Sequence, residues 1–369
     1  MNSLAFFPWF QVGSYVSLAD FRLVPYKRRR LPGGAVQPTL DLLLEPFLET
    51  VKPIRSATLV HHESRDLLAA VDETTASDLF QLRDIIACAG IANREYFGLG
   101  LRYCNRDAFI LAIRDFDMAN PAATVSRTYR RRDGTKHSIA SRTAQSERRP
   151  GHVDSGFGVT LDHALAEALV CARQRLGETA WLRIEDSIRF FNDANSDADQ
   201  VREQAECVYL VSAFERLLDC RHGREKELVK AFLELWQISE PVPREACARP
   251  LQNAAAGATL TEVWLRDFFR HRGGYAHGVL TARHSPVWTV RESLLLGSHV
   301  FPLLMKRVLA SQAAYSWSRQ DEQKAQMLEH LLAEADLFTQ VDDPDEGPRW
   351  PWDRVRENQV WRMLRDPPR

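Results

Sequence analysis

The chain has 369 residues, of which 45% are hydrophobic and 26% are charged. This composition provides apolar material for about two or three folded domains and excludes a chain that is disordered throughout. Its 48 basic and 49 acidic residues give a formal net charge of -1, so any binding of nucleic acid must depend on local basic patches.

The first 150 residues have the mixed signals of an α/β domain. Alternating or short apolar runs predict strands at residues 10–25, 57–60 and 108–113. Helical spacing predicts helices at residues 40–51 and 77–88, the second with Ser77 as a possible N-cap. Asp133 and Gly134 lie between two alternating arms and predict a hairpin over residues 124–140.

The character of the sequence changes after a polar, Gly- and Pro-containing stretch at residues 143–158, which we interpret as a linker. Beyond it, helical periodicity dominates, at residues 161–175, 185–192, 199–218, 225–237, 261–270, 291–310 and 320–338. We therefore expect an α+β protein with a mixed domain at 1–150, an all-α bundle at 155–340 and a C-terminal tail at 341–369.

Several classes of protein are not expected. The six cysteines form no CxxC pair, and His61, His62 and Glu63 are adjacent on a predicted strand whose side chains alternate between faces, so we expect no disulfide framework, metal or cofactor. The first residues lack a basic region and a small-residue cleavage site. No run resembles a membrane span of about 18 apolar residues. We expect a cytoplasmic protein.

The stretch from Arg272 to His277 carries the strongest chemical signal. Gly273 and Gly274 disfavour a helix interior and are predicted to interrupt the helix that precedes them. On an unbroken helix Arg272 and His277 would point about 140° apart, whereas a break would let them converge. A guanidinium, an imidazole and the free N–H groups of a restarting helix suit a phosphate. The alternative is a helix-capping arginine with a core histidine.

A second signal is Glu215, which falls on the apolar face of the helix predicted at residues 199–218. A carboxylate there needs a partner, because an unpaired buried charge is costly. Arg272 is the candidate partner, and we interpret Glu215 as a supporting group rather than a proton-transfer group. Tyr275 is either a core residue or a surface on which a base stacks.

Two segments together resemble the Apea-like branch of the HEPN domain family: residues 187–196 running into 209–218, and residues 272–278 with an Arg-x4-His signature. The resemblance covers residues 185–310 and implies an α-helical bundle. Many such domains are metal-independent endoribonucleases, often toxins or phage-defence effectors, and others only bind RNA or nucleotides. Gly273 departs from the polar residue common after the signature arginine, and Arg270 offers a second frame that also ends on His277.

The resemblance implies a symmetric homodimer that brings two copies of Arg272 and His277 into one cleft. There the RNA 2′-OH would attack the phosphate, histidine would move protons and arginine would stabilise charge. The expected partners are RNA and an antitoxin or a defence protein. The alternatives are a non-catalytic RNA- or nucleotide-binding module and an oligomerisation scaffold. Two basic runs could contact RNA phosphates or be solvated loops: Lys27, Arg28, Arg29 and Arg30, and Arg130, Arg131 and Arg132.

Overall fold

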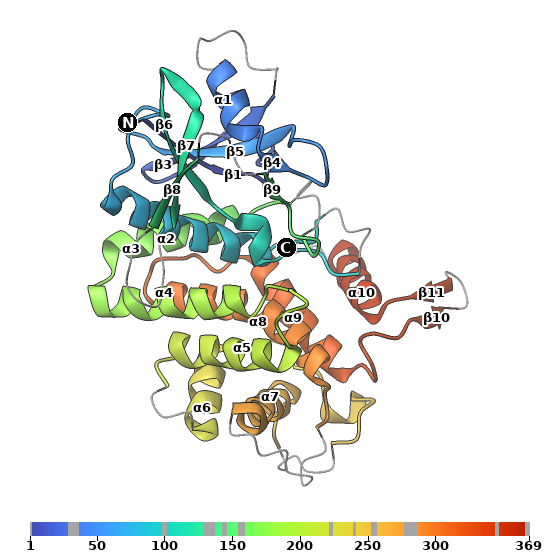
Figure 1. The fold of residues 1–369 in the computed structure, drawn as a ribbon. Coiled ribbons are helices and arrows are strands. Elements are labelled where there is room, and N and C mark those ends of the chain that lie inside the picture. Colours follow the sequence, from blue (N-terminus) through green and yellow to red (C-terminus); the bar gives the residue numbers. More distant parts are fainter. Residues whose placement is uncertain are drawn as a thin grey trace. The chain divides into compact units, whose positions relative to one another are not determined.

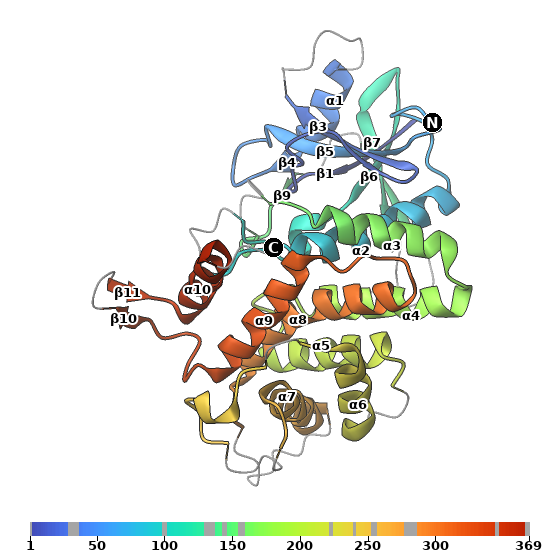
Figure 2. The same cartoon turned by 180° about the vertical axis from the view of Figure 1, so that it is seen from behind.

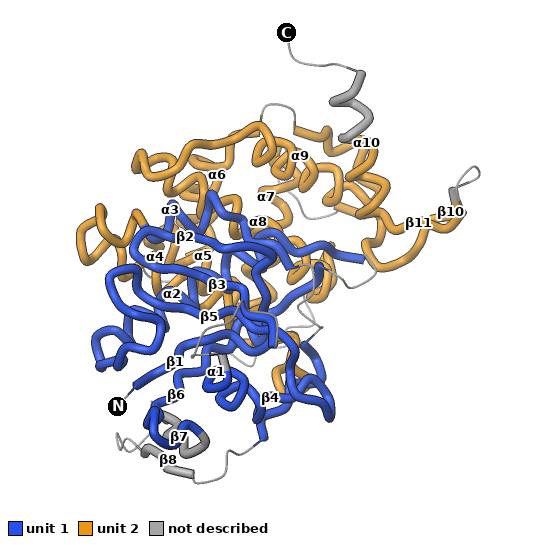
Figure 3. The backbone as a smooth tube through the Cα atoms, turned by 90° about the horizontal axis from the view of Figure 1, so that it is seen from above, with its two compact units in different colours: residues 1–170 blue, residues 171–369 orange. Residues whose placement is uncertain are grey.

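A computed structural model describes residues 2–28, 37–97, 102–128, 137–141, 146–153, 159–220, 224–238, 241–251, 257–276, 286–343 and 347–365. The chain divides into two compact units, Met1–Val170 and Cys171–Arg369, coloured separately in Figure 3. The division lies within helix α3 (His163–Arg175), C-terminal to the linker predicted at residues 143–158.

The first unit is built on an antiparallel seven-stranded sheet in the order β2-β3-β5-β1-β6-β7-β8 (Figure 1). Its strands are β1 (Asn2–Phe7), β2 (Val16–Leu18), β3 (Phe21–Lys27), β5 (Ser56–His62), β6 (Ala112–Asp117), β7 (Asn120–Thr128) and β8 (His137–Ser141). The unit also holds β4 (Phe47–Leu48) paired with β9 (Glu147–Arg148), the helices α1 (Gln37–Leu44) and α2 (Glu73–Ile91), and a 3-10 turn at Arg106–Phe109.

The predictions for this unit are partly confirmed. Residues 57–60 lie in β5, and the strand region at 10–25 is divided between β2 and β3. The hairpin is confirmed by the pairing of Thr128 with His137, and its predicted turn at Asp133-Gly134 lies outside the described residues.

Three details of the predictions are wrong. The helix at 40–51 ends at Leu44, because residues that precede a proline, here Pro46, disfavour helical backbone. Residues 106–109 form a 3-10 turn, so the next strand begins only at Ala112. The cap of α2 is Asp72 rather than Ser77, since its carboxylate accepts from the Thr75 N–H at 2.7 Å.

The second unit is helical, as expected, and Figure 2 shows its helices from behind. They are α4 (Glu178–Asp193), α5 (Glu203–Leu217), α6 (Glu225–Leu235), α7 (Leu260–Ala276), α8 (Val290–Ser311), α9 (Arg319–Ala333) and α10 (Pro351–Arg365). The tail adds a hairpin of β10 (Val341–Asp343) and β11 (Gly347–Arg349) before α10. The α+β class is confirmed, and the α10 end of the tail docks through the buried side chains Trp352 and Val355.

An aromatic core holds four helices of this unit together. Phe191 of α4 stacks on Phe301 of α8 with ring centroids 4.4 Å apart. Phe214 of α5 makes T-shaped contacts with Phe301 and with Phe268 of α7. A Cβ at Gly297 would lie 2.8 Å from Leu210, so the glycine permits the close approach of α8 to α5. These contacts fix α4, α5 and α7 around a common centre.

Helix α8 meets the length and composition of a membrane-crossing segment, with a mean hydropathy of 1.2. Within the described residues it is the one helix that does so, which the sequence did not predict. Of the apolar window, 78% is buried inside the structure, as expected of a core helix.

Glu206 of α5 makes the stability of the helical unit sensitive to pH. Its buried carboxylate accepts from Ser196 Oγ at 3.3 Å, and burial together with the charge of Asp197 raises its pKa to about 7. Because the folded state holds this proton more tightly than the unfolded chain, the resulting stability is present below about pH 4.5 and is lost as the pH rises through about 7.

We therefore expect Glu206→Gln to stabilise the protein by about 2 kcal/mol near pH 8.5 and to change little near pH 5. The measurement is the urea midpoint at both pH values, followed by circular dichroism. Glu178→Gln, at an exposed carboxylate in the first turn of α4, is the control. An equal effect of Glu206→Gln at both pH values would contradict the assignment.

Candidate functional site

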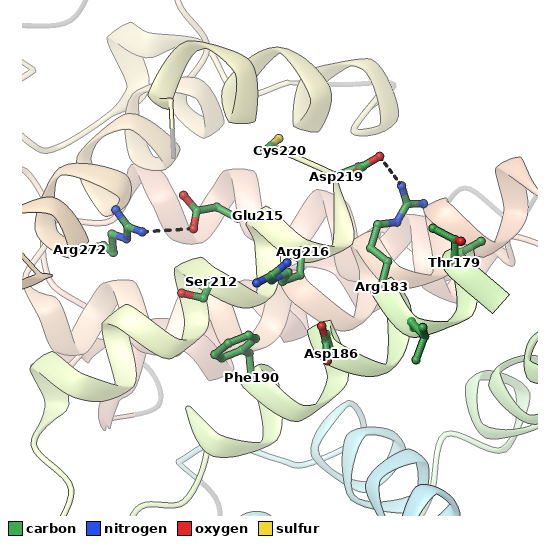
Figure 4. Close-up of a pocket in the computed structure, with 12 residues that line it drawn as sticks. Thr179, Arg183, Asp186, Phe190, Ser212, Glu215, Arg216, Asp219, Cys220 and Arg272 are labelled. Carbon is green, nitrogen blue, oxygen red and sulfur yellow. Dashed lines mark hydrogen bonds and ion pairs between the residues drawn. The ribbon is translucent and has the colours of Figure 1, made fainter. Parts of the chain in front are cut away.

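A groove of about 810 Å³ lies in the helical unit, lined by side chains of α4, α5 and α7 (Figure 4). Its polar lining consists of three arginines, three carboxylates and two hydroxyl groups: Arg183, Arg216, Arg272, Asp186, Glu215, Asp219, Thr179 and Ser212. Ala180, Leu182, Phe190 and Cys220 complete it. The groove is therefore balanced in charge and densely supplied with guanidinium groups.

Arg272 and Glu215 meet in this groove, which confirms the predicted pair. Arg272 Nη2 lies 3.5 Å from Glu215 Oε2, and the two side chains are 21% and 11% exposed. The guanidinium also lies over the ring of Phe269, 5.8 Å from its centroid. The periodicity of α5 points Glu215 toward α7, so the carboxylate meets the arginine across the helix interface.

This ion pair leaves hydrogen-bonding capacity unused on both sides. Arg272 Nε and Glu215 Oε1 are buried and have no hydrogen-bond partner in the described part of the chain. The 3.5 Å separation is long for a charge-assisted hydrogen bond, which is typically about 2.7–2.9 Å. Burial raises the pKa of Glu215, although Arg272 and Arg216 oppose the rise. An anion that offers more oxygen acceptors could therefore replace Glu215 at Arg272.

Arg270 and Arg272, the two candidates for the signature arginine, have different environments in the structure. Arg270 is 44% exposed and donates from Nε to Glu225 Oε2 at 3.2 Å. Glu225 also binds Arg266 at 2.8 Å. Arg270 is therefore part of an ion-pair cluster between α6 and α7, whereas Arg272 lines the groove.

The prediction that Gly273 and Gly274 interrupt the helix is wrong, because α7 continues through both to Ala276. The glycines cost helix stability, but this cost is offset by a strongly buried face that includes Trp264, Phe268 and His271. Without a break, the glycines do not by themselves turn Arg272 toward His277.

Gly273 should tolerate a methyl group. An added Cβ meets no atom within 4 Å, so Gly273→Ala is expected to stabilise α7 by about 0.5–1 kcal/mol. Thermal unfolding against wild type measures the change. A loss of stability would indicate that the helical conformation at Gly273 is not the one that dominates in solution.

Tyr275 is not among the residues that line the groove. Its ring stacks on His271 with centroids 6.4 Å apart, and His271 Nε2 is 2.9 Å from the Trp288 carbonyl oxygen. Burial raises the pKa of Tyr275. These contacts favour the structural interpretation of Tyr275.

His277 follows directly on the last residue of α7 and lies outside the described residues. The flanking chain is firmly held, because the N–H groups of Val287 and Trp288 donate to Asp267 Oδ2 of α7 at 2.9 and 3.1 Å. The chain thus leaves α7 at Ala276 and is attached to α7 again at Val287. Both ends of the segment that contains His277 are fixed to one helix.

The basic runs belong to the first unit. Lys27 is exposed at the end of β3, and Arg28 lies 3.7 Å from both Asp41 and Glu45. These carboxylates offset the charge of Arg28. The other predicted phosphate contacts lie outside the described residues: Arg29, Arg30, Arg130, Arg131 and Arg132.

The sequence pattern did not indicate a role for four residues that line the groove: Arg183, Phe190, Arg216 and Asp219. Arg216 follows Glu215 directly, and Phe190 lies inside a segment that carried the family resemblance. Arg183 and Phe190 are seven residues apart on α4, which places them on one face of that helix. That spacing could have indicated that the two residues share a helix face, but it does not indicate which element lies opposite that face.

The cysteines are all free thiols, and no group of three or more His, Cys, Asp or Glu residues in the described segments could hold a metal ion. No protein-family model, curated protein or solved structure matches the chain significantly.

Proposed function

We propose that the helical unit is a HEPN-type domain that cleaves RNA without a metal ion, in a cytoplasmic toxin or phage-defence effector. The observation that carries the proposal is Arg272, which lines a groove with its Nε buried and unpartnered opposite a carboxylate of raised pKa. A guanidinium in this state suits a phosphate oxygen better than it suits Glu215.

The chemistry needs three contributions. The 2′-OH of the RNA attacks the adjacent phosphorus, so its proton must be removed, and the departing 5′-oxygen must receive one. A histidine has a pKa suited to both transfers, and His277 is the histidine of the signature. Arg272 stabilises the charge that accumulates on the phosphate oxygens, and the products are a 2′,3′-cyclic phosphate and a 5′-hydroxyl.

One chain offers one signature histidine, so we propose a homodimer in which two copies of Arg272 and His277 form one site. An isologous interface brings identical residues of two subunits together at the symmetry axis. Mixing wild type with an excess of His277→Ala protein tests this arrangement. A composite site predicts that the rate per wild-type subunit falls, whereas independent sites predict no change.

The test of the function is incubation of the purified protein with tRNA and with bulk RNA in EDTA, followed by analysis of the 3′ ends. Cleavage that leaves 2′,3′-cyclic phosphate supports the proposal. Binding without cleavage would favour the second candidate, a non-catalytic RNA- or nucleotide-binding module, to which the three groove arginines are equally suited. If the protein neither binds nor cleaves RNA, the remaining candidate is an oligomerisation scaffold.

A further inference from the structure

The groove continues beyond the Arg272–Glu215 pair to a second ion pair at its other end (Figure 4). There Arg183 Nη1 of α4 lies 3.3 Å from Asp219 Oδ2, just after the end of α5. The carboxylate of Asp219 is 50% exposed, whereas the Arg183 side chain is 27% exposed. The more accessible member of this pair is therefore the anion, which a ligand could displace.

Like Arg272, Arg183 has an unused hydrogen-bond donor. Its Nε is buried and has no hydrogen-bond partner among the described residues. Arg216, exposed on α5, lies between the two arginines in Figure 4. Three guanidinium groups thus follow the groove, and the two at its ends are incompletely bonded. Several cations in one groove suit successive phosphates of a strand better than a single anion.

Asp219 occupies a backbone position that favours glycine. The Cys220 N–H donates to the Glu215 carbonyl oxygen at 2.9 Å, and the Asp219 N–H donates to that of Arg216 at 3.3 Å. This bond pattern ends α5 in a Schellman motif, whose left-handed residue is Asp219 with φ of 55°. An aspartate is tolerated there but glycine or asparagine is easier, so the carboxylate that pairs with Arg183 stands at a position with some conformational cost.

The groove has one aromatic lining residue, with a second ring beside it. Phe190 lines it and is half-buried. The ring of Tyr209, on the facing helix α5, lies 6.4 Å from that of Phe190 at an interplanar angle of 33°. Tyr209 is 37% exposed. Aromatic rings beside arginine side chains bind unpaired bases by stacking, since every base has a π-face.

From these observations we infer that the groove between α4 and α5 binds an unpaired RNA strand, with Arg183 as a second phosphate ligand and Phe190 as the surface on which a base stacks. In the absence of RNA the Asp219 carboxylate pairs with Arg183, and a phosphate of the strand displaces the carboxylate. The inference rests on the proposed RNA-binding function and adds the residues that set the register of the strand relative to Arg272.

The test uses a fluorescein-labelled 2′-O-methyl hexauridine, which lacks the nucleophilic 2′-OH and therefore binds without being cleaved. Affinity is measured by fluorescence anisotropy in EDTA. We expect Arg183→Ala to weaken binding about tenfold and Phe190→Leu about fivefold or more. Lys230→Ala, which removes an exposed cation on α6, is the matched control and should change affinity less than about twofold.

Asp219→Asn provides an outcome that misfolding cannot imitate. It removes the competing charge and keeps a residue that tolerates the left-handed backbone, so we expect binding about threefold or more tighter. Unchanged affinity in Arg183→Ala, Phe190→Leu and Asp219→Asn would overturn the inference. Equal competition by a fully paired RNA, or no binding of the probe by wild type, would also overturn it.

Because the probe cannot be cleaved, this result is independent of the ribonuclease proposal. Groove variants that alter binding in a protein without RNA cleavage would support the inference and contradict catalysis. Cleavage that persists while all three groove variants bind normally would contradict the inference alone.

Discussion

Replacing His277 with alanine is expected to reduce RNA cleavage by about a thousandfold or more and to leave the fold intact. Proton transfer by a positioned side chain contributes about 10²- to 10⁴-fold, and a shared site would lose both of its imidazoles. The measurement is the single-turnover rate in EDTA. His163→Ala, an exposed histidine at the start of α3, is the control and should cleave at the wild-type rate.

Fold integrity in His277→Ala is checked by its thermal unfolding, which should match that of wild type. If His277→Ala cleaves RNA as well as wild type, the proposed catalytic role of the signature is wrong. Loss of cleavage with retained binding of the 2′-O-methyl probe would assign His277 to the chemical step.

The second large effect distinguishes the two arginines. Arg272→Ala is expected to lower the cleavage rate about a hundredfold or more, because it removes the cation that faces the groove. The cleavage rate of Arg270→Ala should stay within about threefold of the wild-type rate, since Arg270 is exposed and is held by Glu225. Arg272→Lys keeps the charge but not the planar pair of donors, so its cleavage rate should lie between those of Arg272→Ala and Arg270→Ala.

Arg272→Ala also leaves Glu215 without its cation, so its loss of activity needs a structural control. The double variant Arg272→Ala/Glu215→Gln removes the stranded charge and should regain stability but not cleavage. A larger loss in Arg270→Ala than in Arg272→Ala would favour the Arg-x6-His frame. Arg272 would then be a structural partner of Glu215.

The helical half of the molecule was largely predictable. Helices α6, α8 and α9 begin within one residue of the predicted starts at 225, 291 and 320, because amphipathic spacing is a local property. Strand β1 was not predicted, since five of its six residues are buried and it carries no alternation. A strand buried on both faces cannot be distinguished by periodicity from other apolar runs.

The site divides in the same way. The sequence by itself indicated that Glu215 needs a cation and that Arg272 is a candidate, because the cost of burying a charge depends only on residue type and helix face. Only the tertiary structure decided that α7 continues through Gly273 and Gly274, since its buried face outweighs their low helix propensity. It alone decided that Arg183 faces Asp219, because that pair depends on how α4 packs against the end of α5, which no local pattern encodes.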